Sequence, residues 1–260
     1  AGCTKPTDDE VMMNLAYAMA MKSNCISNQI GAVIEGKDGY IVGAGWNDVG
    51  EGKISCGLRE IKDLEIEWYE RYVEILNGNS KDVKSYLIEE YKNGQPLKIE
   101  EKEFNKFCFC FKDAYSKRKF SEKIKKLAEK CQLPEKYKQI ITKELEEKRL
   151  KYCEALHAEE NAIIQSSKIG GMGLIGGKIY TTAFPCELCA KKIQQVGISE
   201  IIYTEPYPGN ISEPIYLQDT FQKIKVRQFE GVMPHKYFKL FKVVDDQKDW
   251  QKMYSRGLVK

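Results

Sequence analysis

The hydrophobic pattern at the start of the chain predicts a helix followed by two strands. Apolar residues recur at intervals of three and four between residues 8 and 22, which is the period of an amphipathic helix. Two short apolar segments, 29–34 and 40–45, are separated by Gly-Lys-Asp-Gly at 36–39. This arrangement is typical of two strands joined by a tight turn.

Strands and helices alternate in the last third of the chain. The predicted elements are a helix at 157–167, a glycine-rich turn at 170–177, a strand at 178–182, a helix at 187–196, and strands at 200–204 and 223–229. Such alternation implies an α/β sheet that is covered by helices on both faces.

The middle of the chain has a different character. Residues 57–151 are rich in Lys and Glu, with aromatic residues and leucines at helical intervals, and Pro134 and the Asn-Gly-Asn at 77–79 interrupt the pattern. We interpret this stretch as a helical insertion within one domain, whose core is formed by residues 1–56 and 152–260.

Composition limits the class of protein. At 260 residues, with 42% hydrophobic and 30% charged residues, the chain has the composition of an ordinary soluble protein. It contains no run of about 18 apolar residues and no apolar signal segment, so we expect no membrane span. A net charge of +3 does not suggest a nucleic-acid partner. Nine cysteines, an odd number in a chain of this size, favour a reducing, cytoplasmic setting.

Two short motifs carry the chemistry. His157 and Glu159 form H-x-E, and Pro185, Cys186 and Cys189 form P-C-x-x-C. Together they supply three metal ligands, His157, Cys186 and Cys189, and one carboxylate that is not a ligand. A catalytic zinc site keeps one coordination position open, whereas a structural site is closed by four protein ligands. This combination is the signature of zinc deaminases that act on nucleobases.

The signature predicts the roles of its residues. Zinc lowers the pKa of water from about 15.7 to roughly 7, and Glu159 would take and return the proton. We expect Pro185 in the first turn of the second helix, where its missing N–H costs nothing. A closed structural site or a chance match is the alternative interpretation, but Glu159 and Pro185 would have no purpose in one.

Several further segments match one family in order. They are Ser-Asn-Cys at 23–25, Gln-Ile-Gly-Ala-Val-Ile at 29–34, Gly-Trp-Asn at 45–47, and the segments 157–163, 184–191 and 203–207. With them, the chain resembles the cytidine deaminase superfamily, and within it the deoxycytidylate (dCMP) deaminase branch. Segments 202–208 and 231–238 are most similar to bacterial anti-phage dCTP deaminases. The resemblance implies a cytidine deaminase-like three-layer sandwich with a five-stranded mixed sheet.

The same resemblance implies substrate contacts. Asn47 corresponds to the asparagine that contacts the nucleoside, although a turn asparagine after a strand is the alternative. Ser23 and Asn28 correspond to a phosphate-binding loop, and Tyr207 to a tyrosine near the nucleotide. Lys236 would neutralise a longer phosphate chain, or is a solvated surface lysine. Two further candidates for substrate binding are Ala158 and Phe184.

The remaining cysteines raise the question of a second metal. The resemblance to phage-type dCMP deaminases implies a structural zinc near two of them. The candidate ligands are Cys25, Cys56, Cys108, Cys110 and Cys153. The alternative is that they are buried thiols, which pack as small hydrophobic side chains.

We therefore expect hydrolytic deamination of free dCTP, dCMP or both to the uracil nucleotide and ammonia. The resemblance implies anti-phage defence by nucleotide depletion, a homo-oligomer, and a nucleotide regulator. Many relatives also carry a kinase-like domain, but no G-x-x-x-x-G-K-[ST] occurs here, so the chain would lack that domain or be a fragment. The alternatives are a deaminase that edits DNA or RNA, and a non-catalytic zinc scaffold.

Overall fold

The computed structural model describes most of the chain. The described residues are 5–65, 70–75, 80–93, 105–115, 126–127, 130–131, 134, 136–137, 153–170, 173–206, 213–218 and 223–233. The chain divides into two units: the first combines 1–21, 30–46 and 158–260, and the second combines 22–29 and 47–157. The whole range of the predicted insertion, 57–151, falls within the second unit, and its boundaries stay a prediction.

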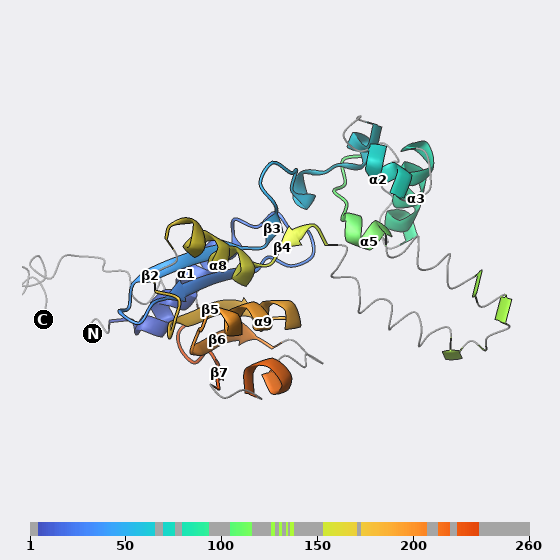
Figure 1. Ribbon diagram of the computed structural model, residues 1–260. Helices are drawn as coiled ribbons and strands as arrows, with labels where there is room; N and C mark the ends of the chain where they lie inside the picture. The colour runs from blue at the N-terminus through green and yellow to red at the C-terminus, as the bar shows by residue number, and fades with distance from the viewer. Residues whose placement is uncertain are drawn as a thin grey trace, which may run out of the picture. The chain divides into compact units, whose positions relative to one another are not determined.

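The first unit consists of a sheet and the helices that cover it (Figure 1). Its elements are α1 (Asp8–Ala20), β1 (Gly31–Glu35), β2 (Ile41–Trp46), α8 (Ala158–Lys168), β5 (Lys178–Ala183), α9 (Glu187–Gln195), β6 (Glu200–Glu205), the π-helical turn η6 (Glu213–Gln218) and β7 (Lys225–Gln228). The elements expected from the hydrophobic pattern are therefore present, with ends displaced by one or two residues.

The sheet has five strands in the order β2-β1-β5-β6-β7. The pairs β2–β1 and β1–β5 are antiparallel, while β5–β6 and β6–β7 are parallel, so the sheet is mixed. The parallel half follows from the sequence because α9 connects β5 to β6, and such a crossover returns the chain in the same direction. The predicted α/β fold with a five-stranded mixed sheet is confirmed.

Alternate residues of the central strands face opposite layers, which makes the unit three layers deep. On β1, Ala32 and Ile34 pack in one hydrophobic cluster with residues of α8 and α9. Val33 lies between them in sequence and packs in a second cluster with Met13 of α1. Because both faces are buried, β1 is hydrophobic along most of its length rather than alternating with polar residues.

Glycines allow helix backbones to lie directly on the sheet. A Cβ at Gly45 on β2 would lie 2.4 Å from both the carbonyl oxygen of Ala158 and the backbone nitrogen of Ala162 on α8. On the other face, a Cβ at Gly31 would lie 2.0 Å from the carbonyl oxygen of Ala16 on α1. The absence of side chains at these positions therefore fixes how closely both helices approach the strands.

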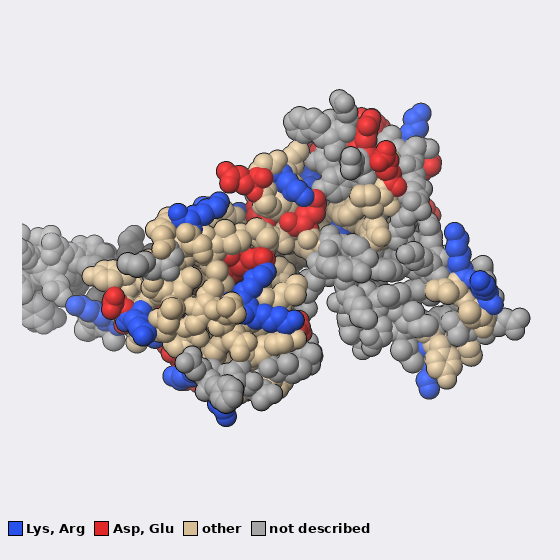
Figure 2. Space-filling view, viewed as in Figure 1, with Lys and Arg blue, Asp and Glu red and all other residues tan. Residues whose placement is uncertain are grey.

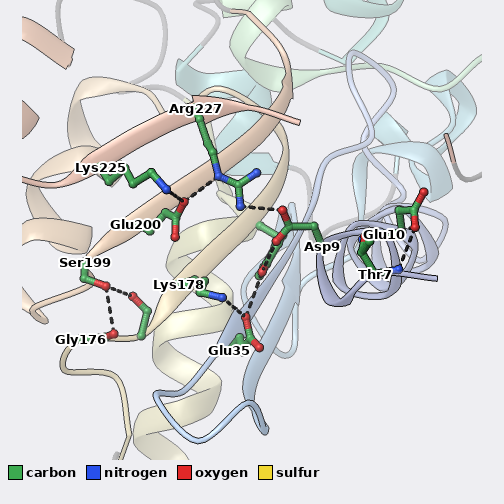
Figure 3. A network of polar contacts seen from close by, with 12 residues as sticks. Thr7, Asp9, Glu10, Glu35, Gly176, Lys178, Ser199, Glu200, Lys225 and Arg227 are labelled. Atoms are coloured by element: carbon green, nitrogen blue, oxygen red, sulfur yellow. Dashed lines mark hydrogen bonds and ion pairs between the residues drawn. The ribbon is translucent and has the colours of Figure 1, made fainter. Parts of the chain in front are cut away.

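A network of charged side chains ties α1 to the edge of the sheet (Figure 3). Arg227 on β7 contacts Asp9 of α1 and Glu200 of β6, each at 2.6 Å. The hydroxyl of Tyr180 lies 2.8 Å from Asp9 and 2.9 Å from Glu35 of β1. At the same N-terminal end of α1, Glu10 and Thr7 form a reciprocal capping box.

Both edges of the sheet end in polar interactions. On β2, the backbone N–H of Ala44 donates to Oε1 of Gln165, which reaches over from α8 at 2.8 Å. On the opposite edge, β7 is four residues long and carries Lys225 and Arg227, both paired with Glu200. Among the described residues, no helix has the length and apolar character needed to cross a bilayer.

The second unit has its own hydrophobic cluster. Its elements are β3 (Asp48–Val49), the 3₁₀ turns η1 (Cys56–Leu58) and η2 (Ile61–Glu65), α2 (Glu70–Ile75), α3 (Ser80–Asn93), α5 (Phe111–Tyr115) and β4 (Ala155–Leu156). Ile61 and Leu64 of η2 pack with Val83 and Leu87 of α3 and with Phe109. The described part of the predicted insertion therefore buries apolar side chains of its own. β3 and β4 form a separate two-stranded antiparallel sheet.

Replacing Gly45 tests the close approach of α8 to β2. We expect Gly45→Ala to lower the free energy of unfolding by about 1–3 kcal/mol, because the added methyl meets helix backbone that has no room to move. Gly50→Ala is the matched control, since a Cβ there meets nothing within 4 Å, and it should change stability by less than about 0.5 kcal/mol. Equal losses in denaturant unfolding of the two variants would contradict this account.

Candidate metal centre

The two cysteines of P-C-x-x-C lie at the beginning of α9. Cys186 is the N-cap residue and Cys189 lies in the first turn, so the three-residue spacing brings both thiols to one side of the helix start. Both residues are buried. Pro185 precedes the N-cap, so the expectation that it occupies the first helical turn is wrong. It instead ends the segment that connects β5 to α9.

The histidine and the acid of H-x-E lie at the beginning of α8. His157 directly precedes the helix, and Glu159 is its second residue. The chain reaches His157 through β4, whose residues Ala155 and Leu156 pair with Val49 and Asp48 of β3. The two-stranded sheet therefore fixes the backbone immediately before the histidine.

The three predicted ligands come together. The ligating atoms of His157, Cys186 and Cys189 all lie within 4.8 Å of one another. Among the described residues, no other group of three or more His, Cys, Asp or Glu side chains brings its ligating atoms so close together. One imidazole and two thiols are the ligand types that zinc prefers, and two of the three are buried, so the donor set fits zinc.

The Glu159 carboxylate lies beside this group without belonging to it. Its side chain is buried, with the residue 4% exposed. The hydroxyl of Thr181 on β5 lies 3.4 Å from Oε1 of Glu159 and also donates to the carbonyl of Ala183 at 3.0 Å. A buried acid next to three ligands, but outside their cluster, is the arrangement that a proton-transfer group requires.

The thiols also indicate that a cation suits the site. The pKa of Cys189 is raised, first by its hydrogen bond with Cys186, then by burial and by the nearby negative charge of Glu159. Without a cation, these three effects therefore disfavour the thiolate form of Cys189. A divalent ion reverses this balance, because thiols bind metals as thiolates and release their protons on binding.

The predicted substrate residues of the second unit contact one another. The hydroxyl of Ser23 donates to the backbone carbonyl of Asn47 at 2.6 Å. The side-chain nitrogen of Asn47 donates to the backbone carbonyl of Asn28 at 2.7 Å. Ser23 and Asn47 are buried and Asn28 is exposed. These bonds hold the 23–28 loop against the start of β3, and the proposed nucleotide contacts of all three residues stay predictions.

Ala158 and Phe184 belong to the hydrophobic cluster that α8 and α9 form with the sheet. Both are buried, and the ring of Phe184 packs edge-on against Tyr203 of β6 at a centroid distance of 4.8 Å. Their proposed contact with substrate also stays a prediction. Tyr207 and Lys236 lie outside the described residues.

Of the five cysteines predicted as ligands of a second metal, four influence one another and Cys108 has a different partner. Cys56 and Cys110 are hydrogen-bonded, which raises the pKa of Cys56 and lowers the pKa of Cys110 to about 7. Cys25 is close enough to both Cys56 and Cys153 to raise their pKa values further. The thiol of Cys108 instead donates to the carbonyl of Gly57 at 3.0 Å. Sequence spacing alone does not distinguish Cys108 from Cys110.

Two ion pairs that flank the histidine had no signal in the sequence. Glu154, three residues before His157, pairs with Arg59 at 2.7 Å, and the side chain of Arg59 is only 2% exposed. Glu160, three residues after it, pairs with Lys192 of α9. Lys and Glu are abundant throughout the chain, so only the folded arrangement shows which of them meet.

Comparison with known proteins agrees with this geometry. Residues 111–205 match the family described as "Cytidine and deoxycytidylate deaminase zinc-binding region". A deoxycytidylate deaminase of Enterobacteria phage T2 is 25% identical over 199 residues, which span 76% of this chain and 80% of that protein. A probable deoxycytidylate deaminase of Drosophila melanogaster is 56% identical over 48 residues, 18% of this chain and only 22% of that protein.

Among solved structures, dCMP deaminase from the cyanophage S-TIM5, in complex with dCMP and dUMP, is 18% identical. It aligns over 87% of this chain and 99% of that one, with a TM-score of 0.44. By the family match and the relatives, the chain is similar to cytidine and deoxycytidylate deaminases, and the family model matches its residues 111–205. The relatives that align over most of the chain, those of phages T2 and T4, are deoxycytidylate deaminases.

Replacing His157 tests the metal centre. We expect His157→Ala to contain one zinc ion fewer per chain than the wild type, because two thiols without the imidazole leave the site short of a ligand. His235→Ala removes the only other histidine of the chain and should leave the zinc content unchanged. Metal analysis after dialysis measures both, and equal zinc in the two variants would exclude His157 as a ligand.

Proposed function

We propose that this chain is a zinc-dependent deaminase of free cytosine deoxynucleotides. The reaction consumes one water: the bond from C4 of cytosine to its exocyclic nitrogen breaks, a carbonyl forms at C4, and ammonia leaves. No oxidant or reductant is needed. The observation that carries the proposal is the group of His157, Cys186 and Cys189 with the buried carboxylate of Glu159 beside it.

The residues divide the work between binding and proton transfer. His157, Cys186 and Cys189 would hold the ion, which when bound supplies a Lewis acid that lowers the pKa of water toward neutrality. Glu159 accepts one proton of the water and delivers it to the ring nitrogen N3. It then transfers the proton of the new C4 hydroxyl to the departing amine, as the C4 carbonyl forms. Its position at the start of α8 suits this role, because the positive end of the helix dipole favours the ionised carboxylate.

The substrate class is supported by the relatives. The phage T2 and T4 proteins, each aligned over 76% of this chain, are deoxycytidylate deaminases. This supports dCMP as a substrate. The motifs at 202–208 and 231–238, which resemble anti-phage dCTP deaminases, support extension to dCTP and a cytoplasmic role in nucleotide depletion during phage infection. The same resemblance supports a homo-oligomer, a nucleotide regulator, and a kinase-like domain as partner.

A free nucleotide also suits the charge distribution better than a nucleic acid. On the face shown in Figure 2, the Lys and Arg side chains of the described residues are interspersed with Asp and Glu. Enzymes that act on single strands favour a positive groove that follows the backbone. The net charge of +3 adds no general attraction to polyanions.

Replacing Glu159 tests the proton-transfer role. Glu159→Gln should keep the zinc content of the wild type but lower kcat on dCMP or dCTP by at least about 10²–10⁴-fold, because the amide cannot accept the proton. Glu187→Gln, a substitution of another acid in the first turn of α9, is the control and should retain turnover. Release of ammonia is followed with dCMP, dCTP, CTP, cytidine and single-stranded oligonucleotides.

The pattern of substrates decides between the hypotheses. Turnover of oligonucleotides alone would favour an editing enzyme, and no turnover of any substrate by the zinc-loaded wild type would favour a scaffold. A Glu159→Gln variant with a normal rate would exclude Glu159 from the reaction.

We also propose a second, structural zinc, held by the neighbouring thiols of the second unit, and it is tested separately. Cys25, Cys56, Cys110 and Cys153 offer four thiols that influence one another, and a zinc ion that bound them as thiolates would have a closed site. We expect Cys56→Ser to lose one zinc per chain and Cys108→Ser to lose none, because the Cys108 thiol is bonded to the carbonyl of Gly57. One zinc per chain in the wild type, with no change in Cys56→Ser, would instead identify these residues as buried thiols.

A further inference from the structure

An ion pair connects the two helices that form the candidate metal centre. Nζ of Lys192 on α9 contacts Oε1 of Glu160 on α8. Glu160 lies in the first turn of α8, next to Glu159 and three residues after His157. Lys192 lies three residues after Cys189, so both share one side of α9. Each partner is therefore about one helical turn from a predicted ligand.

The apolar contact between the helices does not fix their register by itself. Ala158 and Ala162 of α8 pack in the same cluster as Ala190 and Ile193 of α9. Hydrophobic contact is non-directional, and small side chains offer few ridges that would prevent one helix from sliding along the other. A charge-assisted hydrogen bond has a preferred distance and direction, so the Glu160–Lys192 pair supplies the constraint that packing lacks.

Because the pair is partly exposed, we expect it to affect zinc affinity much more than the stability of the fold. The side chain of Lys192 is 44% exposed and that of Glu160 is 21% exposed. Ion pairs this accessible to water contribute little to the stability of the fold. A metal site is more demanding, since ligand positions must be correct to within about 0.2 Å, and residues that orient ligands typically change metal affinity by about 10–100-fold.

The pair before the histidine has a different character. The side chain of Arg59 is almost completely buried where it meets Glu154, and its Nε also donates to the carbonyl of Ile54 at 2.7 Å. Removing one partner of such a buried pair destabilises the fold itself. The Arg59–Glu154 pair therefore belongs to the architecture of the second unit, whereas the Glu160–Lys192 pair is accessible to a test in the folded protein.

We propose that the Glu160–Lys192 ion pair positions the start of α8 against the start of α9, so that His157 is held at coordination distance from Cys186 and Cys189. The two residues are positioning residues, with no contact to substrate in this role. This inference rests on the zinc site of the proposed function. It predicts that the affinity for zinc depends on the pair even where the stability of the fold does not.

A double-mutant cycle on zinc affinity tests the proposal. The dissociation constant is measured by competition with a chromophoric zinc chelator for the wild type, Glu160→Gln, Lys192→Met, the double variant, and the charge-reversed pair Glu160→Lys with Lys192→Glu. We expect each single variant to bind zinc about tenfold more weakly, the double variant to be no weaker than the singles, and the reversed pair to recover part of the loss.

Two controls isolate the pair from other effects. Lys191→Met removes the neighbouring lysine of α9, whose ammonium lies 4.7 Å from the centre of the Tyr216 ring, and should change zinc affinity less than twofold. Thermal unfolding midpoints of the metal-free proteins should agree within about 2 °C across the set, as expected for a partly exposed pair. High salt should narrow the difference between wild type and variants, because it screens the pair.

The outcomes separate this inference from the proposed function. Strong zinc binding by the wild type without turnover of any cytosine nucleotide would refute the proposed activity and leave the affinity test intact. The inference would be overturned if Lys192→Met bound zinc as tightly as Lys191→Met. It would also be overturned if the losses of zinc affinity in the two single variants simply added in the double variant. A wild type that binds no zinc would overturn both.

Discussion

The meeting of two helix starts is the constraint on which the chemistry of this chain depends. His157 directly precedes α8, and the two thiols come from the N-cap and the first turn of α9, yet their ligating atoms lie within 4.8 Å of one another. Neither helix can supply the site alone. The sheet brings them together, because β5 leads directly to Cys186 and the glycines of β2 let α8 lie on the strands without side chains between.

The same convergence shapes the electrostatics of the site. Two helices begin at the site, and the partial positive charge at their starts favours thiolates and carboxylates. The hydrogen bond with Cys186, burial and the charge of Glu159 act in the opposite direction and raise the pKa of the Cys189 thiol. The site thus holds a balance between helix dipoles, which favour negative charge, and low polarity, which disfavours it. A bound cation would tip this balance toward the ionised forms.

Sequence reasoning found what is encoded locally. The H-x-E and P-C-x-x-C spacings identified the three side chains that the fold unites, and hydrophobic periodicity identified α1 and every strand of the large sheet. It missed β3 and β4, because two-residue strands are too short to show a period. It could not separate Cys110, which bonds Cys56, from Cys108, which bonds a backbone carbonyl. Nor could it find ion pairs such as Arg59 with Glu154, whose partners are far apart in sequence.

The polar ends of the large sheet have a consequence for self-association. A strand added beside β2 would have to bond the N–H of Ala44, which is already taken by the amide of Gln165. At the other edge of the sheet, an added strand would meet the short β7, which carries Lys225 and Arg227. Charged and occupied borders of this kind prevent sheets from growing into one another. Edge-to-edge pairing through the large sheet is therefore disfavoured, which removes one route to fibrous aggregates.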